Sequence, residues 1–272
     1  MKTAITADDY NLAGLQNSLH ESLLGNEKAL SLLEFLESDV EVQALLTHGN
    51  TLAIGRLNYN DHGPIHSRIA TINALKILHL LNEREIIPTI VTEHWGSYQD
   101  AQAVVLGATY LHDIGNSIHR EHHHEFALLL AQPILARILP TLYPGEKGHR
   151  IRASILECIY SHDESAKCLS IEGGCVTVGD GADMANGRAR IPFSLGKIDI
   201  HSVSALAIRS VAIHPGKEKP ILIEVQMSES AGVFQIQNVL GKKIQVSGLR
   251  DHIEVRGTVV SGTEEIVDTI VF

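Results

Sequence analysis

The sequence predicts a mainly α-helical protein with a small C-terminal domain of helices and strands. Two observations lead to this fold class. Up to about residue 195 the apolar residues mostly recur three or four positions apart, which places them on one face of a helix. After about residue 198 the chain becomes rich in Val and Ile that partly alternate with polar residues, the pattern of half-buried strands. We therefore expect a helical domain at 1–198 and a small, β-rich α+β domain at 199–272.

The helices of the first part follow from this spacing. The expected segments are 26–38, 41–57, 66–81, 101–111, 122–139, 149–162 and 175–190. The fourth has the clearest boundaries, because Ser97 and Asp100 form a capping-box pattern before it and Gly115 suits its end. Pro133 is expected to bend the fifth. In the last segment, the run 176–178 would equally suit a strand.

The second part contains three segments with a strand pattern. They are 202–215, 219–227 and 251–262, each bounded by Pro, Gly or Lys. The segment 229–244 between the second and the third is expected to be a helix. This mixture of helix and strand gives the α+β class of the C-terminal domain.

Composition limits the classes of partner and location. The net charge of −10 argues against a surface built for long nucleic acids. Three cysteines without CxxC spacing predict no disulfide framework and favour a reducing cytoplasm. The N-terminus lacks the apolar stretch of a signal peptide, and no apolar run reaches membrane-spanning length, so no membrane contact is expected. A homodimer is expected only because it is the commonest oligomer.

The sequence contains 16 histidines, and five of them lie between His112 and His124. Neutral imidazoles and ionised carboxylates bind divalent cations, and several must converge to displace water from the ion. Helix ends can supply such groups across a bundle core. The candidate metal ligands lie at or near the ends of five predicted helices, with two of them adjacent in the sequence. They are His66, His112, Asp113, His124, His162 and Asp180.

Five stretches carry a resemblance to a known family. They are "NDHGPIHSRI", "YLHDIGNS", "HREHHHEFA", "ILECIYSHD" and "VTVGDGADMANGR". Over roughly residues 40–190 their order and spacing resemble the HD superfamily of metal-dependent phosphohydrolases, whose pattern is a lone His, an adjacent His-Asp and a distant Asp.

The resemblance implies an HD-type helical bundle in which His66, His112, Asp113 and Asp180 bind a divalent ion. Members that bind two metals have further histidines, which match His124 and His162 here, with Asp113 as the bridge between the ions. Histidine and carboxylate ligands suit Fe, Mn, Co, Ni and Zn alike, so one or two ions of any of these are expected. The residues left open as replacements for His124 or His162 are His62, His119 and His123.

The resemblance also implies a reaction, in which metal-activated water attacks a phosphate ester of a small substrate, such as a nucleotide or a related phosphorylated metabolite. The residues expected to take part are Asp113, His112, Arg68 and Arg188, with the two arginines binding phosphate. Further cations near the motifs that could bind phosphate are Arg120, Lys167 and Arg190. Two alternatives stay open. One is a di-iron oxygenase of the same superfamily. The other is a non-catalytic metal- or nucleotide-binding sensor, in which the C-terminal domain serves dimerisation or regulation.

Overall fold

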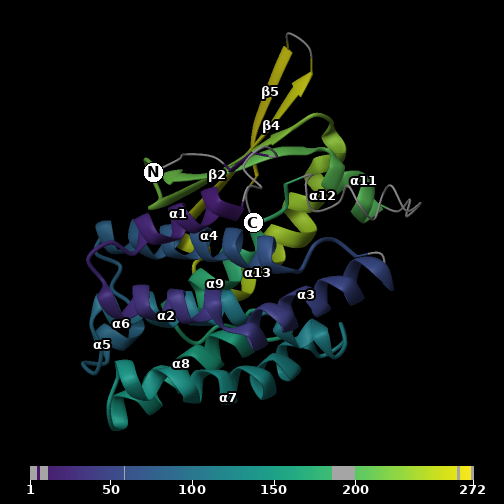
Figure 1. Ribbon diagram of the computed structural model, residues 1–272. Coiled ribbons are helices and arrows are strands. Elements are labelled where there is room, and N and C mark those ends of the chain that lie inside the picture. The colour runs from purple at the N-terminus through teal and green to yellow at the C-terminus, as the bar shows by residue number, and fades with distance from the viewer. Residues whose placement is uncertain (1–4, 7–11, 58, 186–199, 262–263, 271–272) are drawn as a thin grey trace.

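The computed structural model describes residues 5–6, 12–57, 59–185, 200–261 and 264–270. A body of helices lies beneath a small sheet (Figure 1). The body consists of α1 (Leu12–Ser22), α2 (Glu27–Ser38), α3 (Val40–Gly55), α4 (Pro64–Glu83), α5 (Thr89–Thr92), α6 (Tyr98–Leu111), η2 (Ile114–Ser117), α7 (His123–Leu142), α8 (Glu146–Ser161) and α9 (Ile171–Gly181). The predicted class, mainly α with a small α+β part, is confirmed.

The capping box predicted before α6 is present. The Ser97 hydroxyl accepts a hydrogen bond from the Asp100 backbone N–H at 3.2 Å, and the Asp100 carboxylate accepts one from the Ser97 backbone N–H at 2.8 Å. The same carboxylate lies 2.7 Å from the Lys147 ammonium on α8. These contacts fix the residue at which α6 begins and hold that end of α6 against α8. They thereby determine where His112 and Asp113 lie at the other end of α6.

The helix α9 lies against α4 at very short range. A Cβ added at Gly179 would lie 2.7 Å from the backbone nitrogen of Ala74, so only glycine fits at this contact. The helix spans Ile171–Gly181, and the strand alternative for 176–178 is therefore wrong. Of the predicted segment 175–190, residues 186–190 lie outside the described residues.

The C-terminal part combines a sheet with short helices. Its elements are α11 (Ile200–Leu206), β2 (Ile208–Pro215), β3 (Ile221–Met227), η4 (Ser230–Gly232), α12 (Val233–Gln235), η5 (Ile236–Leu240, a π-helical stretch), α13 (Gly241–Val246), η6 (Arg250–His252), β4 (Ile253–Ser261) and β5 (Glu264–Ile270). With β1 (Ile5–Thr6) at one edge, the strand order is β1-β2-β3-β4-β5.

Two features of this part explain how the site is completed. The strands β3 and β4 pair in parallel, so the chain between them must cross over, and it does so through the helices from η4 to η6. This crossover contacts α9. The strand predicted at 202–215 is wrong over its first residues, which form α11, because Ala205 and Leu206 favour a helix. The predicted domain boundary at 198/199 lies outside the described residues.

Among the described residues, α7 alone is long and apolar enough to cross a membrane. One such helix is weak evidence for a membrane span, because core helices of soluble proteins have the same length and composition. It packs against α8 and η2, and it carries the buried His123 and His124 at its start. The absence of membrane contact and the cytoplasmic location stay predictions.

Candidate metal centre

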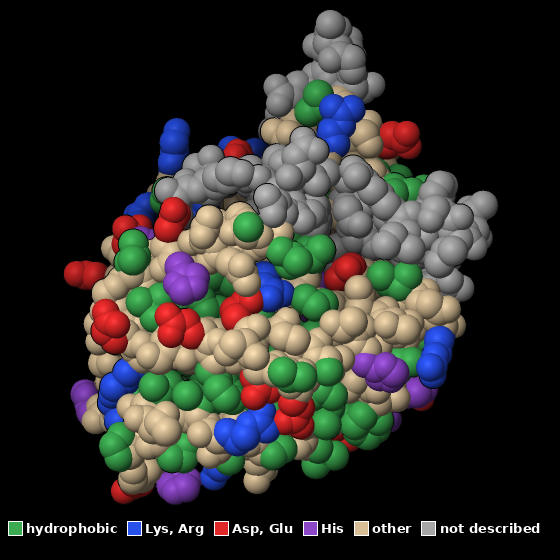
Figure 2. Space-filling model, viewed as in Figure 1, with side chains coloured by type: hydrophobic (Ala, Val, Ile, Leu, Met, Phe, Trp, Pro, Cys, Tyr) green, Lys and Arg blue, Asp and Glu red, His purple; other side chains and the backbone are tan. Residues whose placement is uncertain are grey.

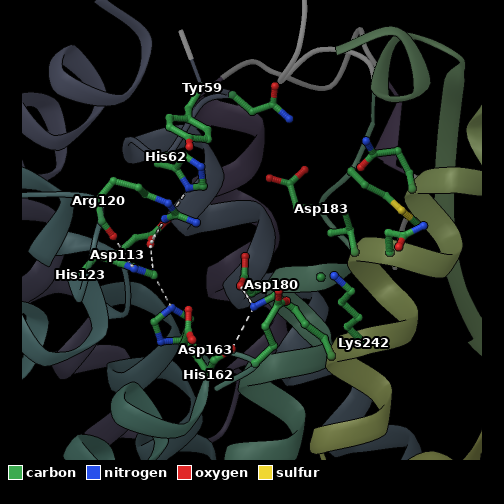
Figure 3. Close-up of a pocket in the computed structure, with 18 residues that line it drawn as sticks. Tyr59, His62, Asp113, Arg120, His123, His162, Asp163, Asp180, Asp183 and Lys242 are labelled. Atoms are coloured by element: carbon green, nitrogen blue, oxygen red, sulfur yellow. Dashed lines mark hydrogen bonds and ion pairs between the residues drawn. The ribbon is translucent and has the colours of Figure 1, made fainter. Parts of the chain in front are cut away.

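Five helix ends converge on one buried polar cluster, of which Figure 3 shows Asp113, His123, His162, Asp180 and Asp183. His66 lies in the first turn of α4, and His123 and His124 begin α7. His112 and Asp113 directly follow α6, and His162 directly follows α8. Asp180 lies in the last turn of α9, and Asp183 lies just after that helix. All eight side chains are buried, which is unusual for charged and polar groups unless they are paired or bind an ion.

The first histidine pair is His66 and His112. Their Nε2 atoms lie 3.2 Å apart. The Nδ1 atom of His112 lies 2.6 Å from the carbonyl oxygen of Thr109, and that of His66 lies 2.7 Å from Asp183 Oδ2. In the neutral form of each ring the Nδ1 is therefore the protonated donor, and each Nε2 then has a lone pair that faces the other. A cation held by both Nε2 atoms would relieve this repulsion, and their separation fits one ion, since two ligands that are each about 2.0–2.1 Å from an ion lie about 2.9–3.4 Å apart.

The second histidine pair is His123 and His162, and it has the same arrangement. Their Nε2 atoms lie 3.1 Å apart. The Nδ1 atom of His162 donates to the carbonyl oxygen of Ile159 at 2.6 Å, and that of His123 donates to the carbonyl oxygen of Arg120 at 3.1 Å. Two lone pairs again face each other at the separation expected of ligands on one ion.

Asp113 lies between the two pairs. Its Oδ2 is 3.4 Å from His66 Nε2 and 3.5 Å from His112 Nε2, while its Oδ1 is 3.4 Å from His123 Nε2. The carboxylate thus offers one oxygen to each pair. The first pair has a second carboxylate as well, because Asp180 Oδ1 lies 3.2 Å from His66 Nε2. These buried groups could hold a metal ion.

The protonation states suit a cation. Burial raises the pKa of Asp113, but His112 and His62 beside it outweigh this and hold the pKa well below its usual range. Burial also raises the pKa of Asp180, and Lys243 outweighs it in the same way. Burial, together with Arg120, lowers the pKa of His123 to about 4. At neutral pH the carboxylates are therefore charged and this imidazole is neutral, as metal ligands must be.

The structure brings most of the predicted residues together, with one exchange. His123, which the sequence left open as a replacement, faces His162 where His124 was expected. His124 lies beside His123 with its Nδ1 buried and without a hydrogen-bond partner among the described residues. It groups with His123 and Asp163 on the outer side of the cluster. His62 lies at the cavity rim, and its Nδ1 is 2.7 Å from Asp113 Oδ2. His119 is exposed.

Of the two arginines predicted to bind phosphate, Arg68 does not lie at the cluster. Arg68 forms an ion pair with Glu37 on α2 and donates to the carbonyl oxygen of Pro64 at 2.7 Å. Its guanidinium therefore ties α4 to α2 and does not line the cavity above the histidines. Arg188 lies outside the described residues.

A cavity of about 490 Å³ opens onto the cluster. In Figure 3, Arg120 and Tyr59 lie on one side of it and Lys242 on the other. Among the described residues, its charged lining consists of five carboxylates (Asp113, Asp163, Glu164, Asp180, Asp183) and three cations (Arg120, Lys242, Lys243). Lys242 and Lys243 come from the crossover between β3 and β4, far from every motif in the sequence, and no spacing pattern pointed to them.

One relative extends over most of the chain. It is the "Uncharacterized protein MJ1020" of Methanocaldococcus jannaschii, which is 42% identical over 245 residues, 90% of each chain. The chain belongs to the same family as this archaeal protein. Because 245 residues exceed the 198 of the predicted helical domain, the family includes part of the C-terminal segment as well. No family model matches the chain, and no solved structure matches it.

Proposed function

We propose that this protein is a metal-dependent phosphohydrolase that hydrolyses a phosphate ester of a small substrate. The observation that carries the proposal is the pair of facing imidazole lone pairs, 3.2 Å and 3.1 Å apart, on the two sides of the Asp113 carboxylate. The resemblance of the motifs to the HD superfamily supports the same chemistry.

The ligands of the two ions follow from the distances. His66, His112 and Asp180 would hold the first ion, His123 and His162 the second, and Asp113 would contact both. When bound, such ions supply a hydroxide nucleophile at neutral pH and positive charge for the phosphoryl oxygens. The protein holds the imidazoles in the required tautomer through hydrogen bonds to backbone carbonyls and to Asp183.

The charge of the cavity favours an anionic substrate once metal is present. The described lining residues, five carboxylates and three cations, give a balance of −2, and two divalent ions would bring it to +2. Arg120 and Lys242 take the place of Arg68 as the proposed phosphate contacts, because both line the cavity and lie on opposite sides of it. The metal-free protein is therefore expected to bind phosphate weakly.

The size of the cavity and the outer surface favour a small substrate over a polymer. About 490 Å³ lies in the range of small-molecule sites. On the face shown in Figure 2, the described Lys and Arg side chains are scattered among acidic ones and do not gather into one patch. Nucleotides and related phosphorylated metabolites are the substrates to test first.

The test is a hydrolysis assay on protein stripped by a chelator and reloaded separately with Mn, Co, Ni, Zn or Fe. We expect reloaded wild type to hydrolyse at least one ester in a panel of phosphate mono- and diesters, and Asp113→Ala to be inert. Asp251→Ala, at an exposed position in η6, is the matched control and should keep full activity. The proposal fails if every reloaded form is as inert as Asp113→Ala. Oxygen uptake with visible absorbance from an iron pair would select the oxygenase instead.

A further inference from the structure

We propose that Lys243 is a positioning residue of the metal centre, which makes the C-terminal segment a working part of the site. The Lys243 ammonium lies 2.6 Å from Asp180 Oδ2 and donates to the backbone carbonyl of His162 at 2.9 Å. Only 12% of its side chain is exposed. This inference rests on the metal site of the proposed function, but not on phosphate hydrolysis.

The two contacts of Lys243 belong to different halves of the centre. Asp180 faces the first histidine pair with its other oxygen, Oδ1, 3.2 Å from His66 Nε2. His162 is a member of the second pair. One ammonium group therefore holds a carboxylate of the first half and the backbone of the second half at a fixed separation. Because Oδ2 is taken, Asp180 presents a single oxygen, Oδ1, to the first pair.

The backbone of α9 is shaped to let this lysine through. A Cβ added at Gly181 would lie 2.9 Å from Lys243 Cδ and 3.3 Å from Lys243 Cβ, so the lysine stem occupies the space that a side chain would fill. A Cβ added at Gly174, two turns earlier, would lie 2.5 Å from the carbonyl oxygen of Ser247. Glycine at both positions allows α13 to approach α9 closely.

Contacts other than those of Lys243 also hold α13 against the helical body. The backbone N–H of Cys168 donates to the carbonyl oxygen of Val246 at 3.0 Å, and Leu249 is fully buried beside Gly174. A substitution of Lys243 is therefore expected to leave α13 in place. What changes is the orientation of Asp180 and of the His162 backbone.

A simpler role for Lys243 would be to neutralise Asp180, and this role predicts the opposite result. If the lysine positions Asp180, its loss weakens metal binding. Loss of a residue that holds a metal ligand in place typically costs about 10–100-fold in metal affinity. If it only balances charge, its loss removes a positive charge next to the cation and strengthens metal binding. The sign of the change separates the two roles.

The experiment is calorimetric titration of the metal-free full chain with Mn²⁺ and with Zn²⁺. We expect Lys243→Met to bind the first ion about 10–100-fold more weakly than wild type. Lys217→Met, at an exposed position between β2 and β3, is the matched control and should bind as wild type does. Equal or tighter binding by Lys243→Met overturns the proposal.

A second variant keeps every charge. Gly181→Ala places a methyl group against the Lys243 stem and should displace the ammonium from Asp180 without removing it. We expect the same loss of affinity, and unchanged binding by this variant also overturns the proposal. If Lys243→Met fails to fold in a thermal-unfolding check, the result for Gly181→Ala decides. The titration uses no substrate, so its result stands apart from any outcome of the hydrolysis assay.

Discussion

The two histidine pairs have the same internal geometry but different surroundings. The first pair, His66 and His112, faces a carboxylate that the second pair lacks, because Asp180 Oδ1 lies 3.2 Å and 3.7 Å from its two Nε2 atoms. The second pair, His123 and His162, has Asp113 between it and the first pair and lines the cavity itself, while Asp163 groups with His123 and His124 and not with His162. Two carboxylates attract a divalent ion more strongly than one, so the first position is expected to be the tighter. The second position is the one whose histidines line the cavity, so it is expected to be the one open to a substrate.

The largest expected effect comes from the group that both pairs share. Asp113→Asn removes the negative charge while keeping nearly the same shape, and both positions lose a ligand oxygen. We expect the affinity for both ions to fall by more than about 100-fold, which exceeds the usual loss when a residue that only positions a metal ligand is removed. Elemental analysis of protein dialysed against a fixed Mn²⁺ concentration measures this. Retention of a tightly bound ion would show that Asp113 does not bridge the pairs.

The next prediction separates the pairs. His112→Asn should remove the tight ion, whereas His162→Asn should leave it in place and remove the weaker one. Titration of both variants with Zn²⁺ would then show one remaining site in each, with the lower affinity in His112→Asn. The comparison between the pairs is wrong if the two variants are indistinguishable.

A smaller effect tests the assignment of His123. His123→Asn should weaken only the second site, while His122→Asn, one position earlier and exposed, should have no effect on metal binding. Asn is the suitable replacement at 122, because His122 has a φ of +59° and Asn tolerates this left-handed region. If His124→Asn abolished the second site and His123→Asn did not, the original assignment from the sequence would be restored.

The smallest effect concerns pH in the metal-free protein. The folded pKa of His123 is about 4, below the value of 6.5 that an unperturbed histidine has, and burial also lowers that of His162. The unfolded chain therefore takes up these protons first as the pH falls. The contribution of the neutral histidines to the stability of the fold is fully present above about pH 6.5, and it is lost as the pH decreases toward about 4. The thermal unfolding midpoint of the wild type should decrease as the pH is lowered across this window, and that of His123→Asn should decrease less steeply. A wild-type midpoint that does not change with pH would contradict the prediction.

The part of the fold that the sequence predicted best has local signals at both ends. Ser97 and Asp100 mark the start of α6, and the apolar run after them leads directly to His112 and Asp113. Where such signals conflict, the prediction is weaker. The segment that begins at Ser170 contains two glycines in its first turns, and the sequence predicts its helix only from residue 175, whereas the helix begins at Ile171. Gly174 is required by its contact with Ser247 at the end of α13, and a Cβ at Gly173 would lie 3.1 Å from the hydroxyls of Ser161 and Ser170; no local pattern contains these contacts.

The same contrast applies to the site. His66 and His112 have no neighbouring histidine within three positions, so the motif identified them directly. His122, His123 and His124 are consecutive, and the turn that selects among them is a left-handed residue at 122, which the sequence does not reveal. Lys243 lies 63 positions after Asp180 and reaches it only through the crossover between β3 and β4. Such contacts arise from tertiary packing and need the structure.

The most direct measurement is anomalous diffraction from a crystal of the full chain soaked in Mn²⁺ and recorded at an energy where manganese scatters anomalously. Two peaks are expected, one between the Nε2 atoms of His66 and His112 and one between those of His123 and His162, with the Asp113 carboxylate between them. A map with no peak at either position, or with manganese bound only elsewhere, would contradict a metal centre built from these residues.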